Sequence, residues 1–271
     1  MNRLSIVVPV YNEGSNFRSL WNEIKRSIRA DFTAYVVYDF DEDDTIPVVS
    51  EIIAQGEARL RLAKNRRGRG VVAAIMSGFD VAPDGPVLVV MADLSDDMTQ
   101  VDRMLALYED GYHIVAGSRY MRGGRLIGGP FFKQLLSRFA GTSLFWLRRL
   151  PTHDATNAFK IYDGAMVRRF EIESTGGFEL NLELTVKAFL GGYRITEVPS
   201  TWRDRTAGQS RFRLWKWLPL YLHWYFYAFR RKSHAPEASR GRRGLTVVAG
   251  STDIAESRPA TQASPQSRFG T

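Results

Sequence analysis

Carboxylates gather at two places along the chain, and each group follows a short apolar segment. Asp93, Asp96 and Asp97 follow residues 87–91, and five acids crowd residues 39–44 after another apolar run. Negative charges this close repel one another unless a cation or a ligand rich in hydrogen-bond donors offsets them. The two clusters therefore predict a site for a divalent metal ion or for a polar ligand.

The same carboxylates have a simpler interpretation, in which they only shape turns and helix ends. Asp96 or Asp97 can cap a helix expected over Met98–Glu109. Asp39 and Asp41 can close a turn through hydrogen bonds to their own backbone. The residue pattern leaves both interpretations open.

The clusters lie between segments that predict alternating strands and helices. Short, mostly β-branched apolar runs indicate buried strands. The expected strands are Leu4–Val10, Ala34–Tyr38, Leu60–Ala63, Val87–Met91, His113–Ala116 and Tyr193–Val198. Their alternation with helices predicts right-handed crossovers and an α/β fold with a doubly wound, mostly parallel sheet. Such sheets bind ligands at the carboxyl ends of their strands, where both carboxylate clusters would lie.

The second half of the chain is more irregular. Residues 121–130 are rich in glycine and arginine, which indicates a mobile loop. A helix is expected over Phe131–Arg149, and Thr152–Tyr162 is predicted to return to the sheet as an irregular segment. Trp202–Phe212 is a polar loop with three arginines.

The composition excludes several kinds of site. The 271 residues include no cysteine, so a disulfide framework and a thiolate metal site are both impossible. The four histidines show neither HxxxH nor HxH spacing, which argues against a zinc centre. The first apolar run is too short for a signal peptide, so we expect a cytoplasmic protein.

The net charge of +8 is unevenly distributed. From residue 230 onward, eight Lys and Arg stand against three Asp and Glu. The rest of the chain is nearly balanced, so the charge predicts contact with an anionic surface near the C-terminus and no nucleic-acid groove across the fold.

An aromatic segment precedes this tail. Residues 213–232 contain eight Trp, Tyr and Phe side chains with basic residues at both ends, and Pro219 and His223 make the segment a poor membrane-spanning helix. Trp and Tyr with basic flanks are typical of an amphipathic helix that lies in a membrane interface. The alternative is a core or dimer helix. Residues 233–271 are predicted to form a disordered basic tail.

Taken in order, these motifs resemble those of the family 2 glycosyltransferases with a GT-A fold, and in particular polyprenyl-phosphate sugar transferases of the dolichol-phosphate mannose synthase type. The resemblance covers about residues 4–212, and residues 1–212 are expected to form the transferase domain. It rests on VVPVYNE, the acidic run ending in Asp43-Asp44-Thr45, Asn65 with Gly68 and Gly70, ADLSDD, GSRY, the Lys133/Ser137 helix and RTAGQSR.

The resemblance implies an inverting transfer of a sugar from a nucleotide-diphosphate sugar to a polyprenyl phosphate. The protein would then attach peripherally to the cytoplasmic face of a membrane. The implied nucleotide-binding residues are Pro9, Tyr11, Glu13, Asp39, Asp41, Asn65 and Gly70. The implied residues for the lipid phosphate and the diphosphate are Arg119, Lys133, Ser137, Arg205 and Arg211, of which Arg119 and Arg205 would act in catalysis together with Asp93.

The resemblance also implies a Mg²⁺ or Mn²⁺ ion, with Asp93 as its carboxylate ligand and Ser95 beside it. Here the chain departs from the family, which usually has Asp-x-Asp where this sequence has Met91-Ala92-Asp93. A thioether does not replace a hard oxygen ligand. A second hypothesis is therefore a protein of the same fold that has lost catalysis or has a different specificity.

Two other hypotheses come from particular residues. Residues 68–73, GRGVVA, satisfy the GxGxxG/A pattern of dinucleotide-binding proteins, which allows an NAD(P)-dependent oxidoreductase. The pattern follows the third expected strand, however, and not the first. Within the transferases, an acceptor with a sugar hydroxyl is an alternative to a lipid phosphate.

Overall fold

The computed structural model describes residues 3–129, 131–204 and 214–230, apart from the side chains of residues 131–133 and 214–216. The strands are β1 Leu4–Pro9, β2 Phe32–Tyr38, β3 Leu60–Lys64, β4 Pro86–Val89, β5 Ile114–Ser118, β6 Arg125–Ile127, β7 Lys160–Asp163, β8 Ile195–Pro199 and β9 Thr201–Arg203. The helices are α1 Gly14–Ser27, α2 Thr45–Ala54, α3 Val71–Val81, α4 Val101–Glu109, α5 Phe131–Arg148, α6 Gly164–Arg168, α7 Leu180–Leu190 and α8 Leu214–Tyr227, and the 3₁₀ turn η1 Met98–Gln100 precedes α4.

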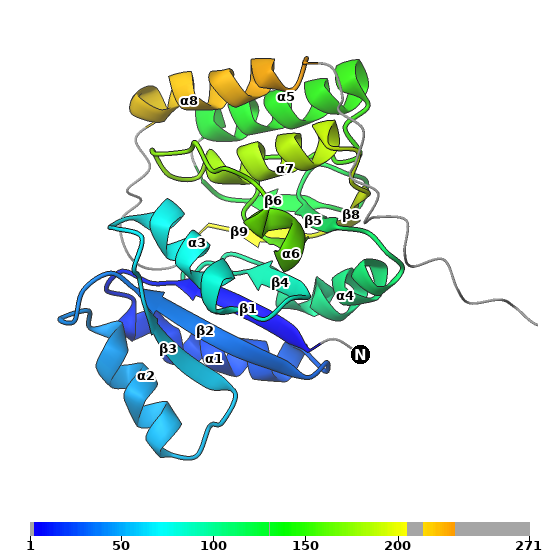
Figure 1. The fold of residues 1–271 in the computed structure, drawn as a ribbon. Helices are drawn as coiled ribbons and strands as arrows, with labels where there is room; N and C mark the ends of the chain where they lie inside the picture. Colours follow the sequence, from blue (N-terminus) through cyan, green and yellow to red (C-terminus); the bar gives the residue numbers. More distant parts are fainter. Residues whose placement is uncertain (1–2, 130, 205–213, 231–271) are drawn as a thin grey trace, which may run out of the picture. The chain divides into compact units, whose positions relative to one another are not determined.

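A seven-stranded sheet with the order β3-β2-β1-β4-β7-β5-β8 crosses the molecule (Figure 1). Neighbouring strands are parallel except at β7, which runs antiparallel to both β4 and β5. This arrangement confirms the predicted doubly wound, mostly parallel sheet. The helices that connect its parallel strands are the crossovers that such a sheet requires.

Strand alternation sends side chains to two separate cores. Ile6 and Val8 of β1 face the core under α1, α2 and α4, whereas Val7 faces the core under α3, α6 and α7. Trp21 of α1 and Phe79 of α3 are among the largest side chains buried on the two sides. Because both faces are covered, the central strand β4 is apolar throughout and β1 is apolar apart from Ser5, as expected for buried parallel strands.

The prediction for Thr152–Tyr162 is only half right. Its first part is irregular, but Lys160–Asp163 forms β7, a regular strand inserted between β4 and β5. Four residues are too few for periodicity to reveal a strand. Because β7 runs against its neighbours, it begins at the edge of the sheet where β4 and β5 end.

The two segments predicted as loops are also partly regular. Residues 125–127 form β6, which pairs in parallel with β9, residues 201–203, in a small second sheet. The prediction of a mobile loop over 121–130 is therefore wrong for residues 125–127. Each strand has three residues, and its partner lies far along the chain, so local sequence patterns carry no signal for the pairing.

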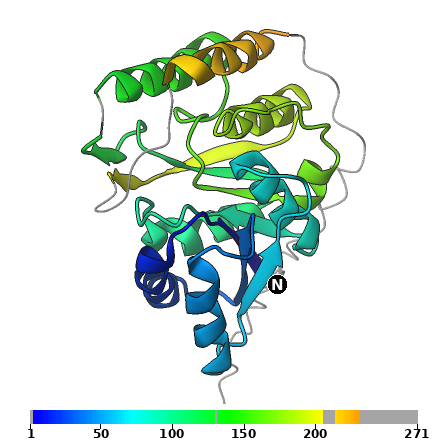
Figure 2. The same cartoon turned by 90° about the vertical axis from the view of Figure 1, so that its left-hand side faces the viewer.

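Helices α5 and α8 lie outside α7, as the outermost layer on that side of the sheet (Figure 2). Trp224 of α8 is buried in the core that α7 also lines, so the aromatic segment is partly a core helix. Within the described ranges, no helix is long and apolar enough to cross a membrane.

Candidate active site

The carboxyl ends of β1, β2, β4, β5 and β8 lie along one edge of the sheet, as their parallel and antiparallel registers require. The segments that leave these ends carry most of the predicted site residues. The segment before β7 enters the sheet at the same edge and adds residues 154–157 to it. Polar groups from distant parts of the chain are therefore brought to one edge of the sheet.

Three of the predicted nucleotide-binding residues hold one another in place. Asp39 Oδ1 accepts a hydrogen bond from Asn65 Nδ2 at 2.7 Å, and Asp39 Oδ2 accepts one from the backbone N–H of Gly70 at 2.8 Å. Gly70 has a φ of +107°, a conformation that favours glycine. Ser77 Oγ donates to Asn65 Oδ1 at 2.7 Å and fixes the amide. The structure thus brings Asp39, Asn65 and Gly70 together.

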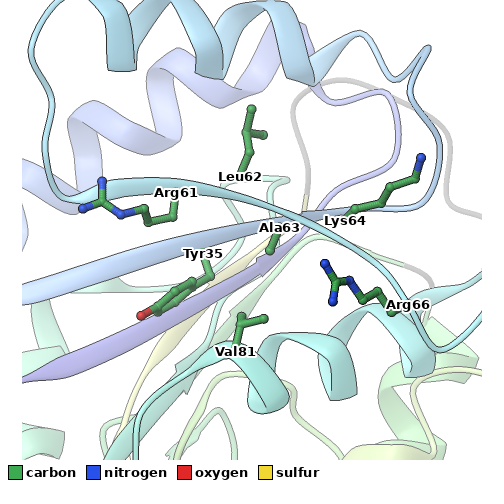
Figure 3. A pocket seen from close by; sticks show the side chains of 7 residues that line it. All are labelled: Tyr35, Arg61, Leu62, Ala63, Lys64, Arg66 and Val81. Atoms are coloured by element: carbon green, nitrogen blue, oxygen red, sulfur yellow. The ribbon is translucent and has the colours of Figure 1, made fainter.

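The segment just after Asn65 also borders a shallow cavity on the opposite side of β3 (Figure 3). It is lined by three basic residues, Arg61, Lys64 and Arg66, together with Tyr35, Leu62, Ala63 and Val81. None of the predicted nucleotide-binding residues lines this cavity. The candidate site is therefore the sheet edge and not this hollow.

The other acids of the cluster after β2 have separate partners. Asp41 forms an ion pair with Lys64 at 2.6 Å, and both side chains are exposed. Asp43 accepts hydrogen bonds from the backbone N–H groups of Asn12 at 3.1 Å and Thr45 at 2.9 Å. These two bonds join the loop after β1 to the loop after β2. Asp43 therefore has a structural role in holding the two loops. This is the kind of role that the turn interpretation gave to Asp39 and Asp41.

The loop after β1 carries the remaining predicted nucleotide residues. Pro9 ends β1, and the half-exposed Tyr11 packs edge-on against Phe40, with 5.2 Å between ring centroids. The backbone N–H of Glu13 donates to Thr45 Oγ1 at 3.0 Å. Aromatic rings and carboxylates from the ends of β1 and β2 consequently line the same stretch of the edge.

Asp93 and its neighbours form a compact loop after β4. Asp93 Oδ1 accepts a hydrogen bond from the backbone N–H of Ser95 at 3.2 Å, and the intervening Leu94 has a φ of +60°. Asp97 caps η1 by accepting from the Thr99 backbone N–H at 3.2 Å, which confirms the predicted capping of the helix that follows. Asp93 is thus in a turn that leaves its carboxylate at the sheet edge.

Asp96 lies in the electric field of Asp93. Burial, reinforced by the charge of Asp93, raises the pKa of Asp96 to about 7, against the opposing effects of a hydrogen bond from the Met91 backbone and of Arg119. The Met91 N–H donates to Asp96 Oδ2 at 3.5 Å. The structure therefore supplies a second carboxyl group close to Asp93, although the usual first aspartate is replaced by Met91.

Arg119 is held by a residue that sequence reasoning missed. Its Nε and Nη2 donate to Asp154 Oδ2 at 2.6 Å and Oδ1 at 2.8 Å, and Asp154 is fully buried. Burial raises the pKa of Asp154, but the charge and hydrogen bonds of Arg119 outweigh this effect and lower it below the usual value. An ion pair with two parallel hydrogen bonds fixes the plane of the guanidinium.

Lys160, at the start of β7, is a second buried charge that the sequence did not reveal. Its Nζ donates to the backbone carbonyl of Ala155 at 2.9 Å and to that of Asn157. Burial lowers the pKa of Lys160 to about 7, with an opposing effect of Asp154. The lysine therefore ties down the segment that carries Asp154. A charged residue at the start of an apolar run was its only signal.

Tyr120 connects Arg119 to α5. The Arg119 guanidinium lies 5.1 Å from the centroid of the Tyr120 ring, and the Tyr120 hydroxyl is hydrogen-bonded to Ser137 Oγ. Ser137 thus contacts the residue next to Arg119. The Lys133 side chain, Arg205 and Arg211 lie outside the described residues.

Glu179, just before α7, is another buried carboxylate near this edge. Its Oε1 accepts from the Gly176 N–H at 2.6 Å, whereas Oε2 has no hydrogen-bond partner within the described part of the chain. Tyr221 of α8 lies between two charges: burial and the charge of Glu179 raise its pKa, and the charge of Arg119 lowers it. Helix α8 therefore lies close to Glu179 and Arg119, and one buried carboxylate oxygen of Glu179 has no hydrogen-bond partner among the described residues.

The donor set suits a hard divalent cation only in part. Within the described ranges, no three His, Cys, Asp or Glu side chains are grouped closely enough to form a metal site from protein alone. Asp93, Asp96 and Ser95 supply oxygen atoms, and Mg²⁺ usually takes one or two carboxylates together with phosphate oxygens. The residues fit an ion that a phosphate ligand helps to hold.

The sequence profile of glycosyl transferase family 2 matches residues 5–174 of this chain. The chain therefore belongs to glycosyl transferase family 2, and its layered sheet is of the GT-A type. This family and the structure overturn the hypothesis of an NAD(P)-dependent oxidoreductase. The Gly70 N–H, which a dinucleotide would need, donates to Asp39 at the start of α3.

Two named relatives are similar over most of the chain. A dolichol-phosphate mannosyltransferase from Pyrococcus furiosus is 27% identical over 218 residues, which are 78% of this chain and 59% of the relative. A polyprenol monophosphomannose synthase from Mycolicibacterium smegmatis is 27% identical over 214 residues, 77% of this chain and 80% of the relative. The matched region thus spans about three-fifths of the length of the Pyrococcus protein.

Solved structures share the fold at low sequence identity. Glucosyl-3-phosphoglycerate synthase from Mycobacterium tuberculosis, in complex with Mn²⁺, UDP and glucosyl-3-phosphoglycerate, gives a TM-score of 0.59 at 14% identity, over 87% of this chain and 81% of that one. TarS from S. aureus, in complex with UDP-GlcNAc, gives a TM-score of 0.54 at 16% identity, over 76% of this chain and 60% of that one.

Proposed function

We propose that this chain is an active hexosyltransferase that moves a sugar from a nucleotide-diphosphate sugar to a polyprenyl phosphate, with inversion, at the cytoplasmic face of a membrane. The observation that carries the proposal is the buried Arg119 guanidinium, held by Asp154 at the same sheet edge as Asp39 and Asp93. A fixed cation opposite carboxylates suits a reaction between two phosphate-bearing substrates. The two named relatives, a dolichol-phosphate and a polyprenol-phosphate enzyme, support the choice of acceptor.

The nucleotide of the donor would lie across the ends of β1 and β2. Asp39, oriented by Asn65 and Gly70, would accept hydrogen bonds from base or ribose donors, and the partly exposed ring of Tyr11 would contact the base. Pro9, Glu13 and Asp41 complete this stretch. Because the carboxylate of Asp39 is already oriented, binding would lose little side-chain entropy.

The diphosphate would lie between the Asp93 loop and Arg119. Asp93, with Ser95 beside it and Asp96 behind it, would hold Mg²⁺ or Mn²⁺, whose charge would offset that of the diphosphate. Arg119 adds a fixed positive charge on the other side. Lys133, Arg205 and Arg211 are proposed to add further cations around the two phosphates.

The acceptor phosphate oxygen would attack C1 of the sugar as the bond from C1 to the nucleoside diphosphate breaks. The electron pair of that bond leaves with the diphosphate, and attack from the opposite side inverts the configuration at C1. A phosphate monoester is already anionic at neutral pH, so the reaction needs no strong general base. If Ser137 Oγ donates to the Tyr120 hydroxyl, the Tyr120 O–H beside Arg119 would be free to donate a hydrogen bond to the acceptor phosphate.

Glu179 is proposed to contact the sugar itself. A buried carboxylate oxygen without a partner costs free energy, which a hydroxyl donor would recover. Phosphates offer no such donor when ionised, whereas a hexose offers several. The geometry therefore favours the sugar over the phosphates as the ligand of Glu179.

Met91 favours a second candidate function, a family 2 protein that binds the membrane but has lost catalysis. Met91 removes the carboxylate that usually accompanies Asp93, and no other acid within the described residues completes a three-ligand group. Asp96 is the residue on which the choice depends, since it supplies a second carboxyl group close to Asp93.

Calorimetric titration of the full-length protein with UDP and with GDP, each in Mn²⁺ and in EDTA, tests the proposal. Metal-dependent binding of one nucleotide is expected, and it names the donor class. Metal-independent binding would mean that Met91 has changed the site. Binding of neither nucleotide would contradict the transferase and support the non-catalytic candidate.

A further inference from the structure

Helices α5 and α8 are joined into one unit. The Ser143 and Tyr225 hydroxyls are 3.0 Å apart, and Arg148 of α5 donates to the backbone carbonyls of Ala228 at 2.8 Å and Arg230 at 2.9 Å, at the end of α8. In both views the two helices lie side by side over α7, farthest from the central sheet (Figures 1 and 2). The pair thus presents one continuous outer surface.

This outer surface, here called the α5–α8 face, is apolar. On α5, Phe139 is 64% and Trp146 is 75% exposed, and on α8 Phe226 is 66% exposed. The large exposed apolar residues of the face are Leu135, Leu136, Phe139, Trp146, Leu147, Leu222, Phe226 and Phe229. Spacings of four and seven residues place Leu222, Phe226 and Phe229 on one stripe of α8. An apolar patch of this extent marks an interaction surface.

The two segments that form this face are basic in sequence and contain no acid. Residues 131–150 and 214–232 contain no Asp or Glu. Their basic residues are Lys133, Arg138, Arg148, Arg149, Lys216, Arg230, Arg231 and Lys232. Glu173, an acid whose charge reaches His223 and Arg230, is itself paired with Lys187 at 2.8 Å. Among the described side chains of these two segments, Arg138, Arg149 and Arg230 are exposed cations.

We propose that the α5–α8 face docks on a bilayer that contains anionic lipid, with α5 contributing apolar contacts as α8 does. Aromatic and aliphatic side chains enter the boundary between headgroups and acyl chains, and each basic residue near an anionic surface adds attraction. A second copy of the chain is a poorer partner, because two such faces would bring like charges together. The inference rests on the proposed function in one respect: a polyprenyl phosphate acceptor lies in the membrane, so the enzyme must bind there to reach it.

The inner side of α5 connects this face to the site. Phe145 stacks on the His153 ring with 3.7 Å between centroids, next to Asp154, and Ser137 contacts Tyr120. Gly141 is so close to the loop that an added Cβ would lie 2.0 Å from the His153 carbonyl oxygen. Docking through α5 would therefore place Arg119 at a fixed position relative to the lipid surface.

Sedimentation with vesicles tests the docking face in the full-length protein. The vesicles are phosphatidylcholine alone or with about one-third phosphatidylglycerol. The variants pair two substitutions on α5, Phe139→Ser with Trp146→Ser, and two on α8, Leu222→Ser with Phe226→Ser. The matched control, Val81→Ser with Ile127→Ser, removes apolar side chains that are 46% and 48% exposed outside the face. A third pair, Arg138→Gln with Arg230→Gln, removes charge.

The wild type should bind the anionic vesicles and much less the neutral ones. Each apolar pair should lower the partition coefficient by about tenfold or more, the charge pair by about fivefold per residue, and the control pair should bind as the wild type does. Wild-type binding by the α5 pair would overturn the role of α5. Equal binding to neutral vesicles would overturn the preference for anionic lipid, and no vesicle binding by the wild type would overturn the proposal.

Two further measurements distinguish bilayer docking from self-association and from damage to the nucleotide site. Sedimentation equilibrium without vesicles detects self-association, and a dimer abolished by the same substitutions would replace the bilayer as the occupant. Calorimetry with UDP and GDP without vesicles monitors the nucleotide site in each variant. A wild type that binds vesicles but neither nucleotide would contradict the proposed function and leave the docking face intact.

Discussion

Arg119, at the end of β5, and Asp154, ahead of β7, form a buried ion pair although 35 positions separate them in the chain. The pair has two parallel hydrogen bonds, and Asp154 also accepts from the Arg119 backbone N–H at 3.1 Å. Arg119 is thus held by side chain and main chain at once. Asp154 therefore fixes the position and orientation of the positively charged Arg119 guanidinium in the site.

Replacing Asp154 by Asn should destabilise the fold strongly. The substitution keeps the shape but leaves the Arg119 charge buried without its counterion, which costs about 3–5 kcal/mol. Urea denaturation measures the change in unfolding free energy. The exposed Arg67–Asp80 pair has the same two-bond geometry, at 2.5 and 2.8 Å, and provides the control. Asp80→Asn should cost at most about 1 kcal/mol, and equal costs for the two variants would contradict the role of burial.

Asp93→Asn should abolish sugar transfer while the fold stays intact. The amide keeps the size of the side chain but loses the charge that a hard divalent cation requires. Transfer from the nucleotide sugar identified by calorimetry is measured in Mn²⁺, with circular dichroism as the check on folding. Asp110→Asn, at an exposed position after α4, is the matched control. Near-normal turnover by Asp93→Asn would show that Asp93 is not the metal ligand.

Glu179→Gln should weaken binding of the nucleotide sugar more than binding of the nucleoside diphosphate. If the free carboxylate oxygen accepts hydrogen bonds from sugar hydroxyls, the loss should be about tenfold for the sugar nucleotide, and the nucleoside diphosphate should bind unchanged. Calorimetry with both ligands gives the ratio of their dissociation constants. Glu171→Gln, on an exposed carboxylate, is the control. An unchanged ratio would remove Glu179 from the sugar site.

Lys160 predicts a particular dependence of stability on pH. Its pKa is lowered from the usual 10.5 to about 7 in the folded chain by burial, so between these values the unfolded chain binds more protons. Stability should therefore rise with pH from about 7 to about 10, by up to about 1.4 kcal/mol per pH unit. The difference between the unfolding free energies of the wild type and Lys160→Met, measured across this range, isolates the effect. Parallel pH profiles for the two proteins would contradict it.

Gly141→Ala tests the close approach of α5 to the segment that carries Asp154. The added methyl group would lie 2.0 Å from the His153 carbonyl oxygen, so the helix or the loop must move. We expect a loss of about 1–3 kcal/mol in unfolding free energy, as for overpacking in a core, although alanine is the better helix former. Gly191→Ala, at the end of α7, meets the edge of the Tyr193 ring at 3.0 Å and should be better tolerated. Urea denaturation of both variants compares them, and an undiminished stability of Gly141→Ala would contradict the close approach.

The sequence by itself determined the class of fold and much of the site. Buried parallel strands are mostly apolar, so the short apolar runs were enough to predict β1, β2 and β4. Because such strands end at one edge, the residues that follow them were expected to lie there, and Asp39, Asn65 and Gly70 do contact one another. These are consequences of local pattern and sheet topology, and they need no knowledge of distant contacts.

Only the tertiary structure decided which of these groups have protein partners and which can serve a ligand. Asp41 is paired with Lys64, Asp43 joins two loops, and Glu179 keeps one oxygen without a hydrogen-bond partner in the described chain. For the same reason, neither the strand β7 nor the role of Asp154, which precedes it, could be predicted from the sequence. Hydrogen bonds and ion pairs depend on distance in space, and a strand that enters the sheet backwards brings together residues that no spacing along the chain relates.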